Sequence, residues 1–180
     1  KNGKIIKTFY TGEYNILEAK SNFGMDVSTS VDLLHKTESV RLKLQTKEEK
    51  EKLLQEFAQV LKTNKKTPQE IEMQIYAPIN VPSNLIQRCM ICFSKFSFMS
   101  TKYHCSVCGT CICKKCFQHS IAILDEEPKK VCSSCFNSFS KFKQENNKPT
   151  NEQIVLCFKK MQQEAIENQT IAAPENLAEF

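Results

Sequence analysis

Residues 89–135 read CMICFSKFSFMSTKYHCSVCGTCICKKCFQHSIAILDEEPKKVCSSC and hold nine of the ten cysteines of this 180-residue chain. Eight of these cysteines form four C-x-x-C pairs, separated by gaps of 12, 4 and 15 residues. Two intervening residues allow both sulfurs of a pair to bind one zinc ion, each at about 2.3 Å. Four such pairs predict two tetrahedral zinc sites. Buried free thiols are much rarer in such a pattern, and a redox dithiol needs only one pair.

The gap of four residues between the second and third pairs is too short for those two pairs to share one ion comfortably. We therefore expect the sites to interleave, with the first and third pairs on zinc 1 and the second and fourth pairs on zinc 2. The predicted ligands are Cys89, Cys92, Cys113 and Cys116 for zinc 1, and Cys105, Cys108, Cys132 and Cys135 for zinc 2. Since the protein fills every position on both ions, neither has a place for a catalytic water, and we expect no enzyme activity from this chain.

Three further residues that could bind metal are left without an assigned ligand role. Cys111 and Cys157 remain after eight ligands are counted, and we expect both to pack as small apolar residues. His104 directly precedes a predicted ligand, where it can bind metal, contact an anion or pack.

Composition limits the class of protein and its partners. The first ten residues, KNGKIIKTFY, have no signal-peptide pattern, and no apolar run approaches the roughly 20 residues of a membrane span. We therefore expect a cytoplasmic protein with reduced thiols. The net charge of +5 suits an anionic surface. Nucleic acid is a poor candidate, because the basic residues are dispersed and lack an aromatic stacking platform.

The remainder of the chain predicts an α+β fold in several parts. Alternating apolar residues favour strands at residues 4–10, 13–19 and 39–45, followed by an amphipathic helix that Thr46 and Glu49 begin with a capping box. A short helix is expected over 68–77 and a final one over about 150–167, begun by Thr150 and Gln153, with an irregular end at 170–180. The expected divisions are 1–64, a linker at 65–79, a zinc finger at 80–140 and a tail at 141–180.

The cysteine segment resembles a FYVE-type zinc finger. KYHCSVCG (102–109) stands where that family has the basic motif R-R/K-H-H-C-R-x-C-G, and KKVCSSCFNSF (129–139) stands where it has R-V-C-x-x-C followed by Phe or Tyr. RING fingers also cross-brace two zinc ions, but typically with a histidine in the middle of the ligand series, so a RING-like ubiquitin ligase is disfavoured. The resemblance implies binding of phosphatidylinositol 3-phosphate on endosomes and a hydrophobic loop that enters the bilayer, here Phe98 and Met99.

The family's basic motif is degenerate in this sequence. Thr101, Tyr103 and Ser106 replace basic positions, Asn80 and Ser83 replace the Trp and Asp of W-x-x-D, and Lys130 replaces an arginine. The resemblance leaves Lys102, His104 and Lys130 as headgroup residues. Lysine offers a point charge in place of arginine's bidentate fork, so we expect weak or relaxed phosphoinositide binding.

The first segment resembles the last strand and C-terminal helix of a pleckstrin-homology (PH) domain. This match rests on residues 38–61, and the segment is shorter than the family's usual length. A PH domain followed by a FYVE finger resembles the tail of Rho-family guanine-nucleotide exchange factors of the faciogenital dysplasia type. The resemblance implies a parent that acts on a Rho-family GTPase and the cytoskeleton.

Two functions compete on this sequence. The first is a non-catalytic membrane-targeting and regulatory tail, peripheral at the endosomal or plasma membrane, whose weak finger needs a second membrane-binding domain or a homodimer. The second is a protein-interaction or autoinhibitory scaffold whose degenerate finger no longer binds phosphatidylinositol 3-phosphate. The apolar stripe of Ile154, Phe158 and Met161, which needs a partner surface, supports the second.

Overall fold

A computed structural model describes residues 14–19, 26–63, 74–124 and 127–176. The N-terminal part is an antiparallel sheet of three strands in the order β1 (Asn15–Glu18), β2 (Ser30–Leu34) and β3 (Val40–Lys43). The helix α1 (Lys47–Thr63) follows directly. The strand expected at 4–10 lies outside the described residues.

One face of this sheet is apolar and packs on α1. The register places Val31 opposite Leu42 and Leu33 opposite both Val40 and Ile16, so these side chains share a face that buries Phe57 of α1. The predicted capping box is present, because the Glu49 amide donates to Thr46 Oγ1 over 3.2 Å and the Gln45 amide donates to Glu49 Oε2 over 3.0 Å.

Strand β2 is not predicted by the sequence pattern, and its polar residues show why. Asp32 is disfavoured in strands, yet here it is buried and accepts two hydrogen bonds from Arg41 on β3, at 2.7 and 2.9 Å. This bidentate pair satisfies the buried carboxylate from a residue nine positions away.

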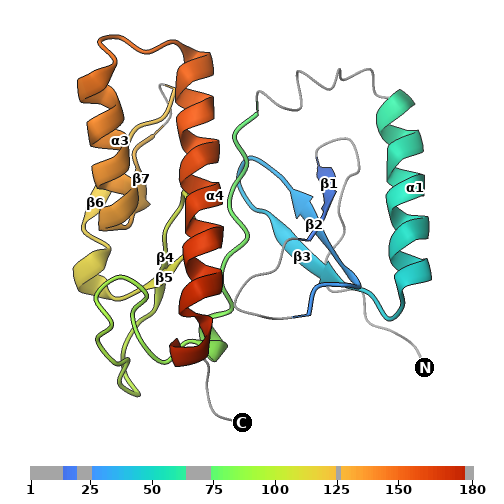
Figure 1. Cartoon of the computed structure of the whole chain (residues 1–180), viewed down its shortest axis with the longest axis horizontal. Helices are drawn as coiled ribbons and strands as arrows, with labels where there is room; N and C mark the ends of the chain where they lie inside the picture. The colour runs from blue at the N-terminus through green and yellow to red at the C-terminus, as the bar shows by residue number, and fades with distance from the viewer. Residues whose placement is uncertain (1–13, 20–25, 64–73, 125–126, 177–180) are drawn as a thin grey trace.

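The C-terminal part combines short strands with two helices. Its strands form two antiparallel pairs, β4 (Tyr103–His104) with β5 (Cys111–Ile112) and β6 (His119–Ile121) with β7 (Lys129–Val131). Single 3-10 turns occur at Ser83–Leu85 and Lys114–Cys116. The helices are α3 (Ser133–Glu145) and α4 (Asn151–Asn176). In Figure 1 these helices stand side by side, and α1 lies across the β1–β3 sheet from them.

Two helix predictions need correction. Of the helix expected over 68–77, residues 68–73 lie outside the described residues, and residues 74–77 are not helical. The Ala77 amide instead donates to the carbonyl of His35 over 2.8 Å. Residues 170–176, expected to be irregular, belong to α4. Ala172 and Ala173 are strong helix formers. The capping box of Thr150 and Gln153 is present, with amide-to-side-chain distances of 2.8 and 3.3 Å.

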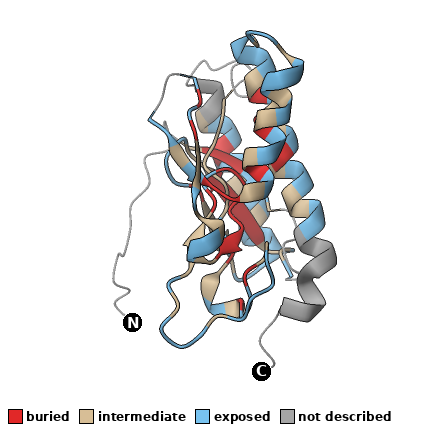
Figure 2. Cartoon of the chain, turned by 90° about the vertical axis from the view of Figure 1, so that its left-hand side faces the viewer, coloured by how far each residue is buried: buried red, intermediate tan, exposed pale blue. Residues whose placement is uncertain are grey.

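The apolar stripe of α4 is covered by the same chain. Phe158 and Met161 are buried in a cluster that also contains five buried cysteines, and Phe158 meets the ring of Phe139 at a centroid distance of 5.3 Å. Figure 2 shows the buried residues gathered inside, with the outer helix surfaces exposed. Among the residues that the structure describes, no helix combines the length and apolar character needed to cross a membrane.

Candidate metal centre

Two groups of four cysteines bring their sulfurs together, within 4.8 Å of one another in each group. The first group is Cys89, Cys92, Cys113 and Cys116, and the second is Cys105, Cys108, Cys132 and Cys135. These are the interleaved sets that the spacing predicts. Sulfurs about 2.3 Å from a tetrahedral zinc lie about 3.8 Å apart. The Cys92–Cys113 and Cys108–Cys132 sulfur distances are 3.7 and 3.9 Å, so both groups have the size of a zinc site.

A turn after each of the first two pairs aims both sulfurs at one ion. The residue after the pair takes a positive φ in each case, Phe93 at 58° and Gly109 at 70°. The amide of this residue donates to the backbone carbonyl of the first cysteine in the pair. The distance is 2.8 Å to Cys89 and 2.9 Å to Cys105. Glycine is required at 109 for a second reason, since a Cβ there would lie 2.4 Å from the carbonyl oxygen of Ile79.

The β4–β5 hairpin explains how the two sites interleave. Strand β4 leads into Cys105 of the second group, whereas β5 leads into Cys113 of the first. Backbone amides also donate to ligand sulfurs, from Cys113 to Cys89 over 3.4 Å and from Cys132 to Cys105 over 3.3 Å. Such hydrogen bonds favour the thiolate, which is the form that binds metal.

The protonation of the cysteines fits this grouping. Hydrogen bonds from its three partner thiols lower the pKa of Cys105, and a hydrogen bond with Ser94 lowers the pKa of Cys92 to about 6. Hydrogen bonds with the other three thiols of its group raise the pKa of Cys135, and zinc binding displaces the protons of its ligand thiols. Each group thus contains a cysteine whose pKa is lowered and a cysteine whose pKa is raised.

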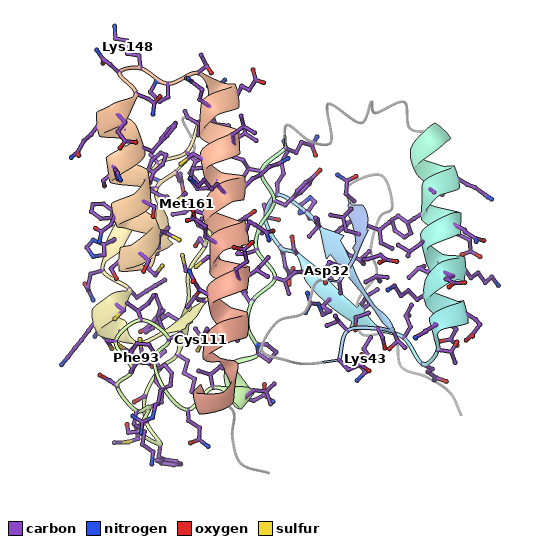
Figure 3. All side chains as sticks on the ribbon, in the orientation of Figure 1. Asp32, Lys43, Phe93, Cys111, Lys148 and Met161 are labelled. Atoms are coloured by element: carbon purple, nitrogen blue, oxygen red, sulfur yellow. The ribbon has the colours of Figure 1, made fainter. Side chains whose placement is uncertain are left out.

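Neither leftover cysteine belongs to these two groups. Cys111 is buried against Val81 and Ile86, and burial raises its pKa to about 11, so it packs as a neutral thiol. Burial also raises the pKa of Cys157 on α4, beside the cluster that contains Phe158. Figure 3 shows Cys111 and Met161 on the side of the molecule where the sulfur atoms gather.

Two of the predicted headgroup residues hold the backbone of residues 81–86. Lys102 Nζ donates to the carbonyls of Ser83 and Ile86, both over 2.7 Å, and lies 5.2 Å from the ring centre of Phe96. His104 Nε2 lies 2.8 Å from the carbonyl oxygen of Val81. Lys130 on β7 is exposed. The headgroup role of these three residues stays a prediction.

The hydrophobic loop residues lie at the tip of a tight turn. Ser97 and Ser100 close this turn by a backbone hydrogen bond of 3.0 Å and by the Ser97 amide to Ser100 Oγ over 2.9 Å. Phe98 and Met99 lie between these two serines and are fully exposed, with relative accessibilities of 103% and 86%. Phe96 is instead partly buried against the finger's core.

Comparison with known proteins agrees with this geometry. The FYVE zinc finger family matches residues 80–141. Human "FYVE, RhoGEF and PH domain-containing protein 6" is 34% identical over 67 residues, which are 36% of this chain and 5% of that protein. "Vacuolar protein sorting-associated protein 27" of Saccharomyces cerevisiae is 36% identical over 67 residues, or 36% of this chain and 11% of that protein. The same-named protein of Candida albicans is 37% identical over 60 residues, 32% of this chain and 7% of that protein.

Residues 80–141 are therefore a FYVE-type zinc finger, a class that binds two zinc ions, and the two groups of four cysteines fit these two ions. The finger is a non-catalytic binding module. The chain spans only a small fraction of the length of these relatives, and the match to them covers about a third of the chain.

Proposed function

We propose that this chain is a non-catalytic module that brings its parent protein to membranes, with weak or relaxed phosphoinositide binding. The observation that carries this proposal is the exposed pair Phe98 and Met99 at the tip of the finger. Exposed apolar side chains of this size, held together on a closed turn, are costly in water unless a partner covers them. A bilayer is such a partner, and FYVE fingers bind phosphatidylinositol 3-phosphate in membranes.

The expected affinity of one finger is modest. Full burial of Phe98 and Met99 contributes about 1.5–3 kcal/mol each, and each lysine near an anionic surface about 1 kcal/mol. The losses of freedom on association cost several kcal/mol. Stable residence then needs avidity from a second membrane-binding domain or a homodimer.

For the parent, we propose a PH–FYVE tail of a Rho-family exchange factor, located at the endosomal or plasma membrane. Two observations support this: a relative whose printed name combines FYVE, RhoGEF and PH domains, and a three-stranded sheet followed by a helix before the finger. The proposed parts are a PH-like segment at 1–64, a linker at 65–79, the finger at 80–140 and the tail at 141–180.

Replacing the tip residues tests the proposal. Phe98→Ser with Met99→Ser is expected to lower the partition coefficient onto anionic vesicles by at least about 100-fold, because the lost burial exceeds about 3 kcal/mol. The measurement is co-sedimentation of zinc-loaded protein with phosphatidylcholine vesicles that contain phosphatidylinositol 3-phosphate.

A matched control removes two exposed apolar residues outside the finger, Leu17→Ser with Leu156→Ser. This variant should sediment like the unchanged protein. Equal sedimentation of the tip variant would remove the basis for membrane insertion.

The scaffold function has one observation in its favour. Lys102 and His104 contact backbone carbonyls of residues 81–86, which takes up two groups that a headgroup would need. If vesicles of any composition fail to sediment the zinc-loaded protein, the finger serves as a zinc-held surface for other proteins. The apolar stripe on α4 no longer supports this alternative, because the chain itself covers Phe158 and Met161.

A further inference from the structure

A shallow hollow lies beside the loop tip. Its volume is about 390 Å³, and its walls include Met99, Ser100, Thr101, Tyr103, Lys114 and Lys115. Met99 belongs to the exposed tip, so the hollow opens next to the residues that we propose to enter the bilayer. A group bound here would lie at the level of the lipid headgroups.

Two lysines, Lys114 and Lys115, line this hollow beside Cys113, a predicted zinc 1 ligand. Residues 81–124 contain Arg88, Lys95, Lys102, Lys114 and Lys115 and not a single Asp or Glu. Zinc with four thiolates carries a formal charge of about −2. All of these cations except Lys102 lie within three positions of a zinc 1 ligand in the sequence. Their summed charge of +4 exceeds the charge of about −2 on zinc 1 and its thiolates by two. The surplus attracts anions.

The donors in the hollow are available for a ligand. Lys114 and Lys115 are exposed, and no ion pair involves either of them within the described parts of the chain. The ring of Tyr103 stacks on Phe117 at 4.6 Å, which fixes its position. Thr101 is exposed beside it. Among the hydrogen bonds of the described residues, none uses the hydroxyl of Thr101 or Tyr103.

Lys102 differs from Lys114 and Lys115 because its ammonium group already has hydrogen-bond partners. Its ammonium group already makes two hydrogen bonds of 2.7 Å to carbonyls and lies over the Phe96 ring. Binding a phosphate would require it to give up those contacts. Lys114 and Lys115 can bind one at no such cost.

We propose that this hollow binds the phosphate group of a membrane lipid, through Lys114 and Lys115 with help from the hydroxyls of Thr101 and Tyr103. The inference rests on the proposed membrane function and deepens it, since it places the phosphate beside the loop tip and away from the 81–86 segment. Lysine lacks the planar fork that matches phosphate bidentately, so the site discriminates poorly among phosphate-bearing lipids.

The test compares two pairs of adjacent lysines in the zinc-loaded protein. Lys114→Gln with Lys115→Gln removes the proposed site, whereas Lys159→Gln with Lys160→Gln removes the same charge from α4, outside the finger. Vesicles of phosphatidylcholine hold either phosphatidylinositol 3-phosphate or phosphatidylserine at matched charge. A lysine near such a surface contributes about fivefold in affinity, so we expect the first variant to lose about 25-fold on both vesicles and the second less than threefold.

Further measurements separate the possible failures. Two zinc ions per chain must be found in each variant, and Lys114→Arg with Lys115→Arg should restore binding if the change in charge, and not a damaged zinc site, caused the loss. Inorganic phosphate should shift the amide resonances of residues 99–103 and 113–116 in the unchanged protein and not in the Gln variant.

Each remaining outcome decides one of the two proposals. Equal losses in the two Gln variants would overturn the phosphate site and leave the membrane function standing. Phosphate shifts without vesicle binding would support the site and remove the membrane function. Failure of both phosphate and vesicles to bind would overturn both.

Discussion

Removal of zinc is expected to unfold residues 80–141. Structural zinc contributes about 10–16 kcal/mol of apparent binding free energy per site at pH 7, which exceeds the total stability of a typical small domain. The core of the finger depends on these ions, because Cys89 and Cys105 are completely buried among small residues such as Val107 and Val131. Without metal, that core would hold five buried thiols in place of zinc-bound sulfurs. A unit of this size then buries too little apolar surface to stay folded.

The measurement is the dispersion of amide resonances before and after a zinc chelator, with the metal content determined in parallel. The dispersion of the amide resonances of residues 80–141 should be lost after chelation and should return when zinc is added back. Magnesium serves as the control cation and should not restore them, because it prefers oxygen ligands. The chelator should act at lower concentration as the pH falls, since protons compete with zinc for the thiolates. An unchanged spectrum after complete zinc loss would contradict the assignment of these sites as structural.

The second large effect is expected from Phe158→Ala on α4. Phe158 is buried against Phe139 and the finger's core, and removal of a buried phenylalanine costs about 3–5 kcal/mol. The control is Leu156→Ala, two residues away on the same helix and 57% exposed, which should cost less than about 1 kcal/mol. Denaturant unfolding of the zinc-loaded variants provides both values. Equal costs would mean that α4 does not belong to the core of the finger.

The metal sites could be predicted from sequence because their chemistry is local. Two intervening residues are enough to bring the sulfurs of one C-x-x-C pair together, and the short gap before Cys113 indicates which pairs combine. The helix starts at Thr46 and Thr150 were equally readable, since a capping box is closed within four residues.

Features that depend on distant partners were not predicted. Strand β2 contains Asp32, whose buried charge is tolerated only because Arg41 pairs with it across the sheet. The start of α3 was also missed, although Phe136, Phe139 and Phe142 recur at helical spacing after Cys132. Its cap is the ligand Cys132 itself, whose sulfur accepts from the Cys135 amide over 3.4 Å.

The lipid-binding residues are the least predictable part of the site. Lys102 stands at a basic position of the family motif, but its actual partners are the carbonyls of Ser83 and Ile86. That segment reaches Lys102 because the Val81 amide bonds to the carbonyl of Gly109 over 3.1 Å. A sequence motif gives the type of each residue but does not show which backbone groups its side chain will bind.

The central claim, that the finger's tip enters membranes, can be tested directly because the chain has no tryptophan. Phe98→Trp therefore supplies a single fluorophore at the tip, and Leu156→Trp supplies a matched one on α4. With vesicles that contain phosphatidylinositol 3-phosphate and brominated phosphatidylcholine, the account predicts a blue shift and quenching for Trp at position 98 and neither at 156. Unchanged emission at position 98, under conditions where the protein sediments with the vesicles, would contradict insertion.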